Sequence, residues 1–563
     1  MAAGADDAAQ IRQILVDYRP DSDPLPLTRA VSGVQRLVRA AGFANLAGSA
    51  RALVWTLGAI ALTYRSRTDT AQPGDLDLAI SWTENAVQAW PDDDPNLPRA
   101  RINLATALTD RYERGADPAD LSAALALFAA ALPDLRANGD RLDVALHSYG
   151  SAYHAHATAP GGGGGVEDLD RAIELFTEAL RCPEPDREER AGYLNSLGLS
   201  QRAKGRALAD PALLARSAET FGEARDLASF GGEAFLSASI NLATVLEDRA
   251  ETDNDVTFLE EAVRLRREVL PLLSPSDQLR QIQVTTNLAA GLIDLYRHTR
   301  DRRLLDDATR DLRANAERMP DGPVGMTVLA NLAAALHEMF DYTGRLALLD
   351  EAIAVQERLV AAPNPRPPER TMNLGVSLLA RFRRRRCERD LDRAIELFEE
   401  TARVTTSAID RAAALNSQAN ALSLRFDESG VGADLDRCIE LRDEAVRVAP
   451  NGSLDRALYQ GNLGVDLLKR FEIRGGDDDL RRALDNQRQA VRAVPVSGSD
   501  QPRLLAGLAD SLAQEADRSG RAGDAEQART AYRRAVGTGQ VSLPEQALGA
   551  ALRWGGWESR HRS

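Results

Sequence analysis

The fold of this chain is decided by the stretch LDRAIELFEE, residues 391–400. If the stretch is helical, Leu391, Ala394 and Phe398 share one face, and charged residues such as Asp392 take the other. The spacing therefore predicts an amphipathic helix with an apolar face turned toward other helices.

Shifted copies of this stretch recur along nearly the whole sequence. Their first apolar positions, 42 to 48 residues apart, are Leu76, Leu121, Leu169, Leu214, Leu259, Leu305, Leu349, Leu391, Leu435, Leu480 and, in a degenerate copy, Ala525. Three residues further on, each copy has a small residue: Ala79, Ala124, Ala172, Ser217, Ala262, Ala308, Ala352, Ala394, Cys438, Ala483 and Ala528. A side chain that is small at one phase of eleven helices marks the place where a neighbouring helix comes close.

A second set of helices alternates with the first. It is marked by a polar or small residue, then Leu or Tyr, then Gly or Ala, as in Asn103-Leu104-Ala105, and it has nearly the same spacing. We therefore expect an all-α solenoid, a superhelical array of about eleven antiparallel helix pairs with a period of about 45 residues. Residues 1–45 are expected to form N-terminal capping helices, 46–540 the repeat array, and 541–563 a C-terminal capping helix and tail.

The composition of the chain argues against several classes of protein. The net charge is −15 and is spread along the chain, which argues against a general nucleic-acid or anionic-membrane surface. No apolar run of membrane-spanning length is apparent, and the start MAAGADDAAQ lacks the pattern of a signal peptide, so we expect a cytoplasmic protein. The three cysteines lack metal-ligand spacing, and the sequence suggests no metal site and no cofactor.

The repeats resemble a known family. NLGVSLLARF (373–382) and NLGVDLLKRF (462–471) resemble the first helix of a tetratricopeptide repeat, and the small residue of the second helix is followed four positions later by an aromatic residue in several copies. The resemblance covers about residues 46 to 540. The period exceeds the family's 34 residues, and we expect the extra length mainly between the two helices, as in Arg381–Asp390 and Phe471–Asp479. HEAT repeats, which have a similar period, are the structural alternative.

The resemblance also implies a function. Long repeats reading LDRAIELFEEA are similar to those that precede the caspase-like CHAT protease domain in many bacterial proteins, although no such domain follows here. The family's usual role implies a non-catalytic scaffold, not an enzyme, that binds a protein or peptide through its concave surface. The alternative is a sensor or regulatory arm of a caspase-like protease or other effector, encoded separately or truncated from this chain.

Aligned asparagines are the first candidate site. By resemblance, the first helices line the concave surface, where side-chain amides can bind the backbone of an extended peptide. The candidates are Asn103, Asn241, Asn287, Asn331, Asn373 and Asn462. In the alternative interpretation these amides hydrogen-bond the neighbouring repeat.

The end of the chain provides a second candidate. Leu543–Glu558 is expected to be one further helix, with Trp554 and Trp557 on one face. These tryptophans either cover the last repeat or, as similar helices in CHAT proteins imply, are partly exposed and dock a partner domain.

The glycine run and the histidines of the sequence have simpler explanations than a functional site. The run Gly161–Gly165 lacks the Lys-Ser/Thr of a phosphate-binding loop and is expected to be a loop insertion. His147, His154 and His156 are spaced too widely, or point too differently, to bind one metal ion.

The basic run ARFRRRRCERD ends in Asp390. We expect its arginines to be neutralised by Asp390, Asp392 and Glu396 of the following helix, and an anionic partner is the alternative.

Overall fold

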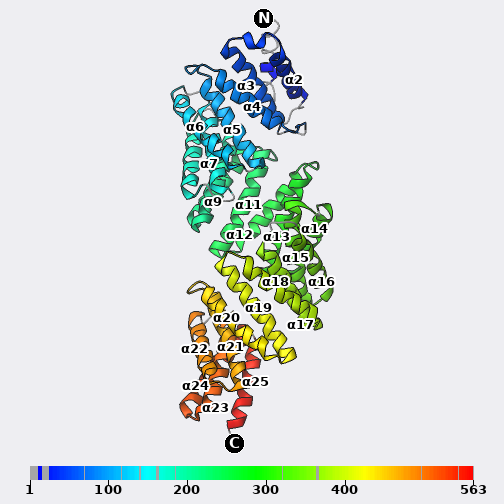
Figure 1. The fold of residues 1–563 in the computed structure, drawn as a ribbon, viewed down its shortest axis with the longest axis vertical. Helices are drawn as coiled ribbons and strands as arrows, with labels where there is room; N and C mark the ends of the chain where they lie inside the picture. The colour runs from blue at the N-terminus through cyan, green and yellow to red at the C-terminus, as the bar shows by residue number, and fades with distance from the viewer. Residues whose placement is uncertain are drawn as a thin grey trace. The chain divides into compact units, whose positions relative to one another are not determined.

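The structure, a computed structural model, describes residues 11–14, 25–66, 68, 70–115, 117–138, 141–159, 164–183, 185–319, 321–362, 367–495, 498–542 and 544–561. Within these ranges all regular structure is helical, so the predicted all-α class is confirmed (Figure 1). The chain divides into two compact units, Met1–Leu304 and Leu305–Ser563, and each is described by itself.

The first unit contains paired helices after an N-terminal helix. Its helices are α2 (Leu25–Arg39), α3 (Gly48–Arg65), α4 (Asp75–Ala89), α5 (Leu97–Gly115), α6 (Pro118–Asn138), α7 (Leu142–Thr158), α8 (Val166–Arg181), α9 (Arg187–Leu208), α10 (Pro211–Leu227), α11 (Glu233–Asp253), α12 (Thr257–Val269) and α13 (Gln278–Thr299). Short 3₁₀ helices lie at Phe43–Asn45 and Leu270–Leu272. Each helix from α3 to α12 packs on the one that follows it within the unit, as expected for a solenoid.

The second unit continues the same order. Its helices are α14 (Arg302–Arg318), which begins at the boundary, α15 (Gly322–Thr343), α16 (Leu346–Ala361), α17 (Pro368–Arg385), α18 (Glu388–Val404), α19 (Ala408–Ser429), α20 (Gly432–Val448), α21 (Leu454–Arg474), α22 (Asp477–Ala493), α23 (Gln501–Ser519), α24 (Ala522–Ser542) and α25 (Pro544–His561). The sequence did not indicate a boundary at Leu304, because the period passes through Leu305 unchanged.

The small residues of the second helices lie in the core. All eleven, from Ala79 to Ala528, have 0% of their surface exposed. In two repeats the small side chain contacts the backbone of the first helix directly, because Ser217 Oγ donates to the Gly198 carbonyl at 2.8 Å and Cys438 Sγ to the Ala419 carbonyl at 3.2 Å. The position is small because the two helices of one repeat touch there.

A glycine in the first helix accommodates an aromatic ring from the second. A Cβ atom added to Gly375 would lie 2.6 Å from Cε1 of Phe398, and one added to Gly198 would lie 2.7 Å from Cε1 of Phe221. Both phenylalanines are fully buried. No side chain fits between these helices, so the Leu-Gly pair of the first helix and the aromatic residue of the second are complementary.

The extra length of the repeat is not where the sequence analysis placed it. Arg381–Asp390 is helical except for Arg386 and Cys387, and Phe471–Asp479 is helical except for Gly475 and Gly476. Several first helices instead reach 22 residues, as α9 and α15 do. The prediction of long interhelix loops was therefore wrong, because the polar, arginine-rich segments continue the last turns of the helices.

Arginines near the ends of first helices link successive repeats. Arg381 donates to both carboxylate oxygens of Asp390, at 2.8 and 2.7 Å, and to Asp350 of the preceding repeat at 3.2 Å. Equivalent triplets are Arg111 with Asp120 and Asp77, Arg425 with Asp434 and Asp392, and Arg470 with Asp479 and Asp436. Each arginine thus joins its own second helix to the one before it, and the contact with the preceding repeat was not predicted from the sequence.

One described helix contradicts the expectation that no apolar run approaches membrane-spanning length. By length and composition, the segment Pro118–Ala137 of α6 is long and apolar enough to cross a membrane, with a mean hydropathy of 1.3 over its best window. It nevertheless has the pattern of a second helix in the array, since Ala124, Phe128 and Ala131 are fully buried in a cluster with residues of α5 and α7. Its apolar character is therefore explained by packing within the first unit.

Candidate functional site

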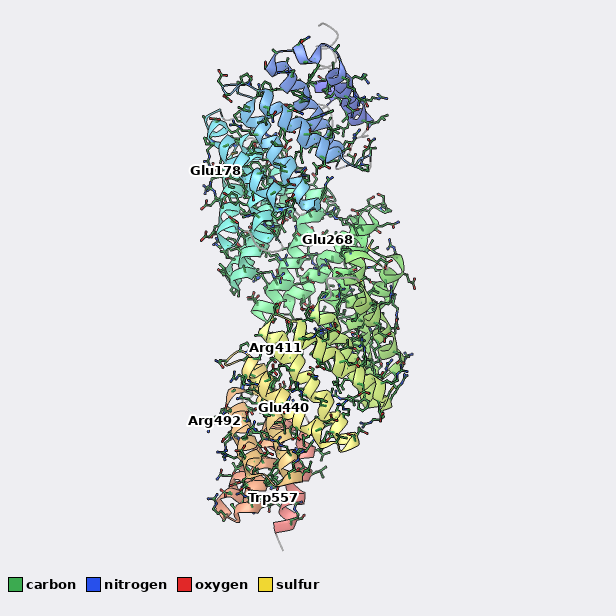
Figure 2. All side chains as sticks on the ribbon, viewed as in Figure 1. Glu178, Glu268, Arg411, Glu440, Arg492 and Trp557 are labelled. Carbon is green, nitrogen blue, oxygen red and sulfur yellow. The ribbon has the colours of Figure 1, made fainter. Side chains whose placement is uncertain are left out.

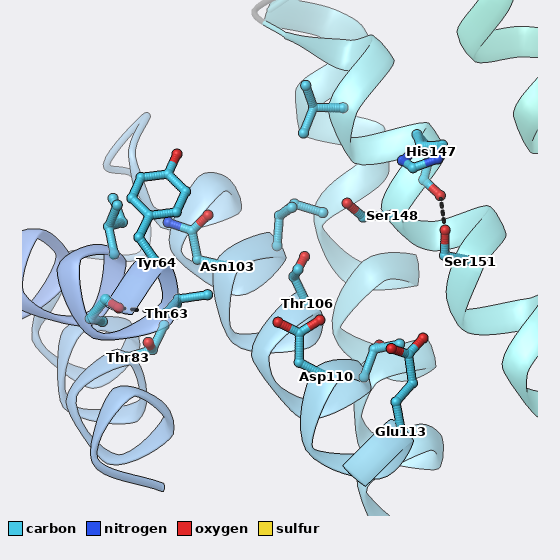
Figure 3. Close-up of a pocket in the computed structure, with 15 residues that line it drawn as sticks. Thr63, Tyr64, Thr83, Asn103, Thr106, Asp110, Glu113, His147, Ser148 and Ser151 are labelled. Carbon is cyan, nitrogen blue, oxygen red and sulfur yellow. Dashed lines mark hydrogen bonds between the residues drawn. The ribbon is translucent and has the colours of Figure 1, made fainter. Parts of the chain in front are cut away.

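A groove of about 400 Å³ crosses the first helices of three consecutive repeats in the first unit. Its walls are formed by α3, α5 and α7, as Figure 3 shows. It is lined by Ala59, Ile60, Thr63, Tyr64, Thr83, Ile102, Asn103, Thr106, Thr109, Asp110, Glu113, Val144, His147, Ser148 and Ser151. All but Thr83, which belongs to α4, lie on a first helix, and the resemblance implied that first helices border a groove.

One face of α5 provides most of the polar groups. Asn103, Thr106, Asp110 and Glu113 follow one another at steps of three, four and three residues, which places them on the same side of a helix. Figure 3 shows them in this order along α5. The sequence analysis singled out Asn103 but missed the two carboxylates, although the same helical spacing would have found them.

The outer walls combine apolar and hydroxyl groups. Tyr64 of α3 and Val144 of α7 are 41% and 38% exposed, and the hydroxyl-bearing Ser148 and Ser151 lie on α7. Ser151 Oγ donates to the backbone carbonyl of His147 at 3.1 Å, so this hydroxyl is partly engaged within its own helix. A groove with an amide, hydroxyls, carboxylates and exposed apolar surface suits a peptide segment.

His147 contributes no positive charge to the groove near neutral pH. Its ring stacks on Tyr193 with the centroids 4.5 Å apart, and its Nε2 atom lies 2.9 Å from Ser196 Oγ. Burial lowers the pKa of His147 to about 4, and the charge of Asp143, which acts in the opposite direction, does not compensate for it.

The contact between His147 and Ser196 joins the first helices of two neighbouring repeats. Nε2 of His147 lies 2.9 Å from Ser196 Oγ, and the Gly192 carbonyl lies 3.2 Å from the same hydroxyl. His154 and Ser200 repeat the arrangement, with His154 Nδ1 2.9 Å and the Ser196 carbonyl 3.3 Å from Ser200 Oγ.

The three histidines of α7 bind different partners. His147 contacts Ser196, His154 contacts Ser200 at 2.9 Å, and His156 Nδ1 contacts Asp168 Oδ2 at 2.7 Å. Among the residues that the structure describes, no group of three His, Cys, Asp or Glu side chains is placed to hold a metal ion.

The structure places the six asparagines in different surroundings. Asn103 lines the groove. Asn241 donates to Asn195 Oδ1 of the preceding repeat at 2.9 Å, and Asn462 donates to Asn416 Oδ1 at 3.4 Å. Asn241 and Asn462 therefore form the inter-repeat hydrogen bonds of the alternative interpretation.

The remaining three asparagines lie outside this groove. Asn287 and Asn373 are exposed, and Asn331 is half-buried. Their predicted role in binding a peptide stays a prediction.

Trp557 lacks the exposure that the docking hypothesis expects of it. It is 2% exposed, its Nε1 donates to Asp517 Oδ1 of α23 at 2.6 Å, and its ring lies 6.5 Å from that of Tyr532 of α24 (Figure 2 labels Trp557). Trp554 is half-buried and stacks on Tyr532. The docking hypothesis required both indoles to be partly exposed, and for Trp557 this is wrong, because α25 turns it inward onto the last helix pair.

Three arginines of the basic run pair with carboxylates, most of which lie on neighbouring repeats. Asp390 binds Arg381 as expected, but Asp350 binds Arg385 at 2.8 Å and Glu428 binds Arg386. Asp392 and Glu396 do not take this role. Asp392 binds Arg425 of the following repeat, and Glu396 binds Arg393 of its own helix.

The glycine run is only partly described. Gly161, Gly162 and Gly163 lie outside the described residues, and Gly165 is the N-cap residue of α8.

Comparisons with known proteins agree with the repeat architecture. The model of the tetratricopeptide repeat family matches residues 235–274 and 326–366, which cover most of the pairs α11–α12 and α15–α16. No curated protein matches the chain in sequence.

Several solved structures match the chain in the structural comparison. They include yeast Tom70 (14% identity, 92% of this chain and 97% of that chain, TM-score 0.35) and the human IFIT1 dimer with m7Gppp-AAAA (16%, 94% and 98%, 0.39). BtubC from P. vanneervenii also matches (18%, 48% and 95%, 0.28). At TM-scores below 0.5 these likenesses carry no argument about function. The chain is therefore an all-helical repeat protein in which two segments match the tetratricopeptide repeat model.

Proposed function

We propose that this protein is a non-catalytic scaffold that binds an extended segment of another protein in the groove formed by α3, α5 and α7. The observation that carries the proposal is the groove itself, which crosses three repeats and presents the polar face of α5 between exposed side chains of α3 and α7. Such a surface is suited to a short extended chain, whose backbone can bind amides and hydroxyls.

The chemistry of the groove supports binding rather than catalysis. The lining combines the amide of Asn103, the hydroxyls of Thr106 and Ser148 and the exposed side chain of Val144, which suits an extended peptide. The three cysteines form no disulfide with one another, which suits the cytoplasm as the compartment of this scaffold. The link to a caspase-like protease remains a sequence-based prediction.

The test blocks the groove with one bulky side chain. Short random peptides displayed on phage are selected against the full chain, and the affinity of enriched peptides is measured by fluorescence anisotropy. Thr106→Trp should weaken their binding by about ten-fold or more, because the indole fills the floor of the groove.

The matched control is Ser122→Trp. Ser122 is an exposed hydroxyl residue of a second helix, α6, and does not line the groove. If selected peptides bind both variants as they bind the parent, the groove is not the binding surface and the proposal is wrong.

A further inference from the structure

The groove of α3, α5 and α7 reaches down to a residue of a second helix. Thr83 of α4 lines it, whereas the other lining residues named above belong to first helices. Thr83, labelled in Figure 3, is 2% exposed, compared with 38% for Val144 of α7. A side chain of a ligand that enters the groove beside Thr83 would therefore be shielded from water between α3 and α5.

In later repeats an aromatic ring occupies the position of Thr83. This position lies four residues after the small residue of the second helix, which is Ala79 in α4. Four later repeats have a phenylalanine there, and each of these rings is at most 1% exposed: Phe128, Phe176, Phe221 and Phe398. The interface between successive repeats is therefore built to enclose a phenyl ring at this phase.

A ring at this position lies between two successive first helices. Phe128 of α6 stacks on Tyr149 of α7, the next first helix, with the centroids 5.1 Å apart. The first helix of the same repeat closes the other side, since a Cβ atom added to Gly150 of α7 would lie 2.8 Å from Cε1 of Phe176 in α8. In the first repeat of the array the same place lies between α3 and α5, which both line the groove.

Trp82, the neighbour of Thr83, points to the other side of α3. A Cβ atom added to Gly58 would lie 2.4 Å from Cζ3 of Trp82, and the indole belongs to a cluster with Val34 of α2 and Leu57 of α3. The described members of this cluster lie on or before α4. The side toward α5 is therefore left to the short side chain of Thr83, and the space above it is part of the groove.

The part of the groove around Thr83 is largely apolar. The hydroxyls of Thr63, Thr83 and Thr109 donate to carbonyls of their own helices at 3.0, 2.7 and 3.0 Å. Because a hydroxyl has a single hydrogen, these threonines present methyl groups and no further donor. Ala59 of α3 and Ile102 of α5 add hydrocarbon surface on both sides. Such a lining favours an apolar side chain over a polar one.

We infer that this groove holds its partner segment by an aromatic anchor, a phenylalanine side chain that enters between α3 and α5 above Thr83. This inference rests on the proposed function, since it names the side chain that the same groove recognises. The ligand would supply in this repeat the ring that the chain itself supplies in four later ones. A large apolar ring enclosed in a pocket contributes strongly to affinity.

The first test changes the ligand. Peptides selected on the full chain and blocked by Thr106→Trp are resynthesised with alanine at each position in turn. Replacing the anchoring phenylalanine should lower the affinity by about ten-fold or more, and leucine at the same place should restore only part of it, because it buries less apolar area. This measurement needs no further protein variant, so it does not depend on how a substitution folds.

A second test fills the space from the protein. Thr83→Phe introduces the residue of the later repeats and should lower the affinity of the same peptides by about ten-fold or more, with the helix content unchanged in circular dichroism. The matched control is Gln487→Phe in the second unit. Gln487 follows the small residue Ala483 by four positions, is 1% exposed and lies against Gly464, as the phenylalanines lie against their glycines. This control should leave the affinity unchanged.

The outcomes separate this inference from the proposed function. If peptides blocked by Thr106→Trp contain no aromatic residue or tolerate alanine at each one, or if a folded Thr83→Phe variant binds them like the parent, the groove binds peptides and the aromatic anchor is wrong. If Thr83→Phe does not fold, the peptide series decides by itself. If no selected peptide is blocked by Thr106→Trp, the proposed function is itself wrong.

Discussion

At the scale of single residues, the same sequence position has different roles in different repeats. Four residues after the small residue of the second helix, four repeats have a phenylalanine and two others have Arg266 and Arg442. The phenylalanines are Phe128, Phe176, Phe221 and Phe398. Both arginines are buried. Arg266 pairs with Glu247, and Arg442 binds Asp466, Asn416 and Asn420. A charge is tolerated in this core position only because carboxylates and amides of adjacent helices surround it.

His147 makes stability depend on pH. In the unfolded chain a histidine binds a proton below about pH 6.5, whereas the folded protein keeps the pKa of His147 near 4. The stability contributed by the neutral imidazole is therefore fully present above pH 6.5 and is lost as the pH falls toward 4. We expect the free energy of unfolding of the parent, measured in urea, to fall relative to that of His147→Gln by up to about 3 kcal/mol across this range.

The control for this prediction is His298→Gln, which removes an exposed histidine of the same unit. Because this side chain is exposed, its replacement should change the free energy of unfolding at pH 7 by no more than about 0.5 kcal/mol. Equal pH profiles for the parent and His147→Gln would show that the imidazole is not held neutral by burial.

At the scale of helices, the sequence predicted the buried faces of the second helices correctly, but it did not predict where the first helices end. The periodicity of apolar residues identified the buried face of each second helix, and the structure confirms it in Leu391, Ala394 and Phe398, which are at most 2% exposed. It did not show that first helices run on through arginine-rich segments such as residues 381–385. Helix ends depend on which partners the last side chains find, and for Arg381 and Arg385 these partners, Asp350 and Asp390, lie on other helices.

α25 should stabilise the last helix pair through Trp557. Trp557→Ala removes a buried indole from a cluster that includes Tyr532 and Ala528, and we expect it to cost roughly 3–5 kcal/mol. Native-state hydrogen exchange should show faster opening of α23 and α24, because each repeat depends mainly on its neighbours.

Leu552→Ala, on the same helix, provides the comparison. Leu552 is 68% exposed, so its truncation should change stability by no more than about 0.5 kcal/mol. If the two substitutions had equal effects on exchange in α23 and α24, α25 would not act as a closing helix.

At the scale of the whole molecule, we expect that one repeat can be deleted without loss of the fold, because the repeats are equivalent units. Deleting residues 331–372 joins Ala330 to Asn373 at the same phase of two first helices and brings Asp306, one residue after Leu305, to the place of Asp350 beside Arg381. We expect the shortened chain to keep its helix content per residue in circular dichroism and to unfold cooperatively, since stability in a solenoid is the sum of local terms.

Deleting residues 331–351 provides the contrast. This deletion removes half a period and joins a first helix to the second-helix sequence that starts at Ala352. The join turns buried faces toward water and should cause unfolding or aggregation. If both deletions behaved alike, the repeats would not be equivalent units.

The sequence by itself determined the helix pairs, their period and their buried faces, because these follow from the spacing of apolar and small residues along one helix. It also placed Asn103 on the side where the groove lies. Only the tertiary structure decided what each polar side chain does. The amides of Asn241 and Asn462 bind neighbouring repeats, whereas Asn103 lines a groove with Asp110 and Glu113. The reason is physical: a hydrogen bond depends on which group of another helix comes within about 3 Å, and that distance is set by packing between repeats rather than by spacing within one.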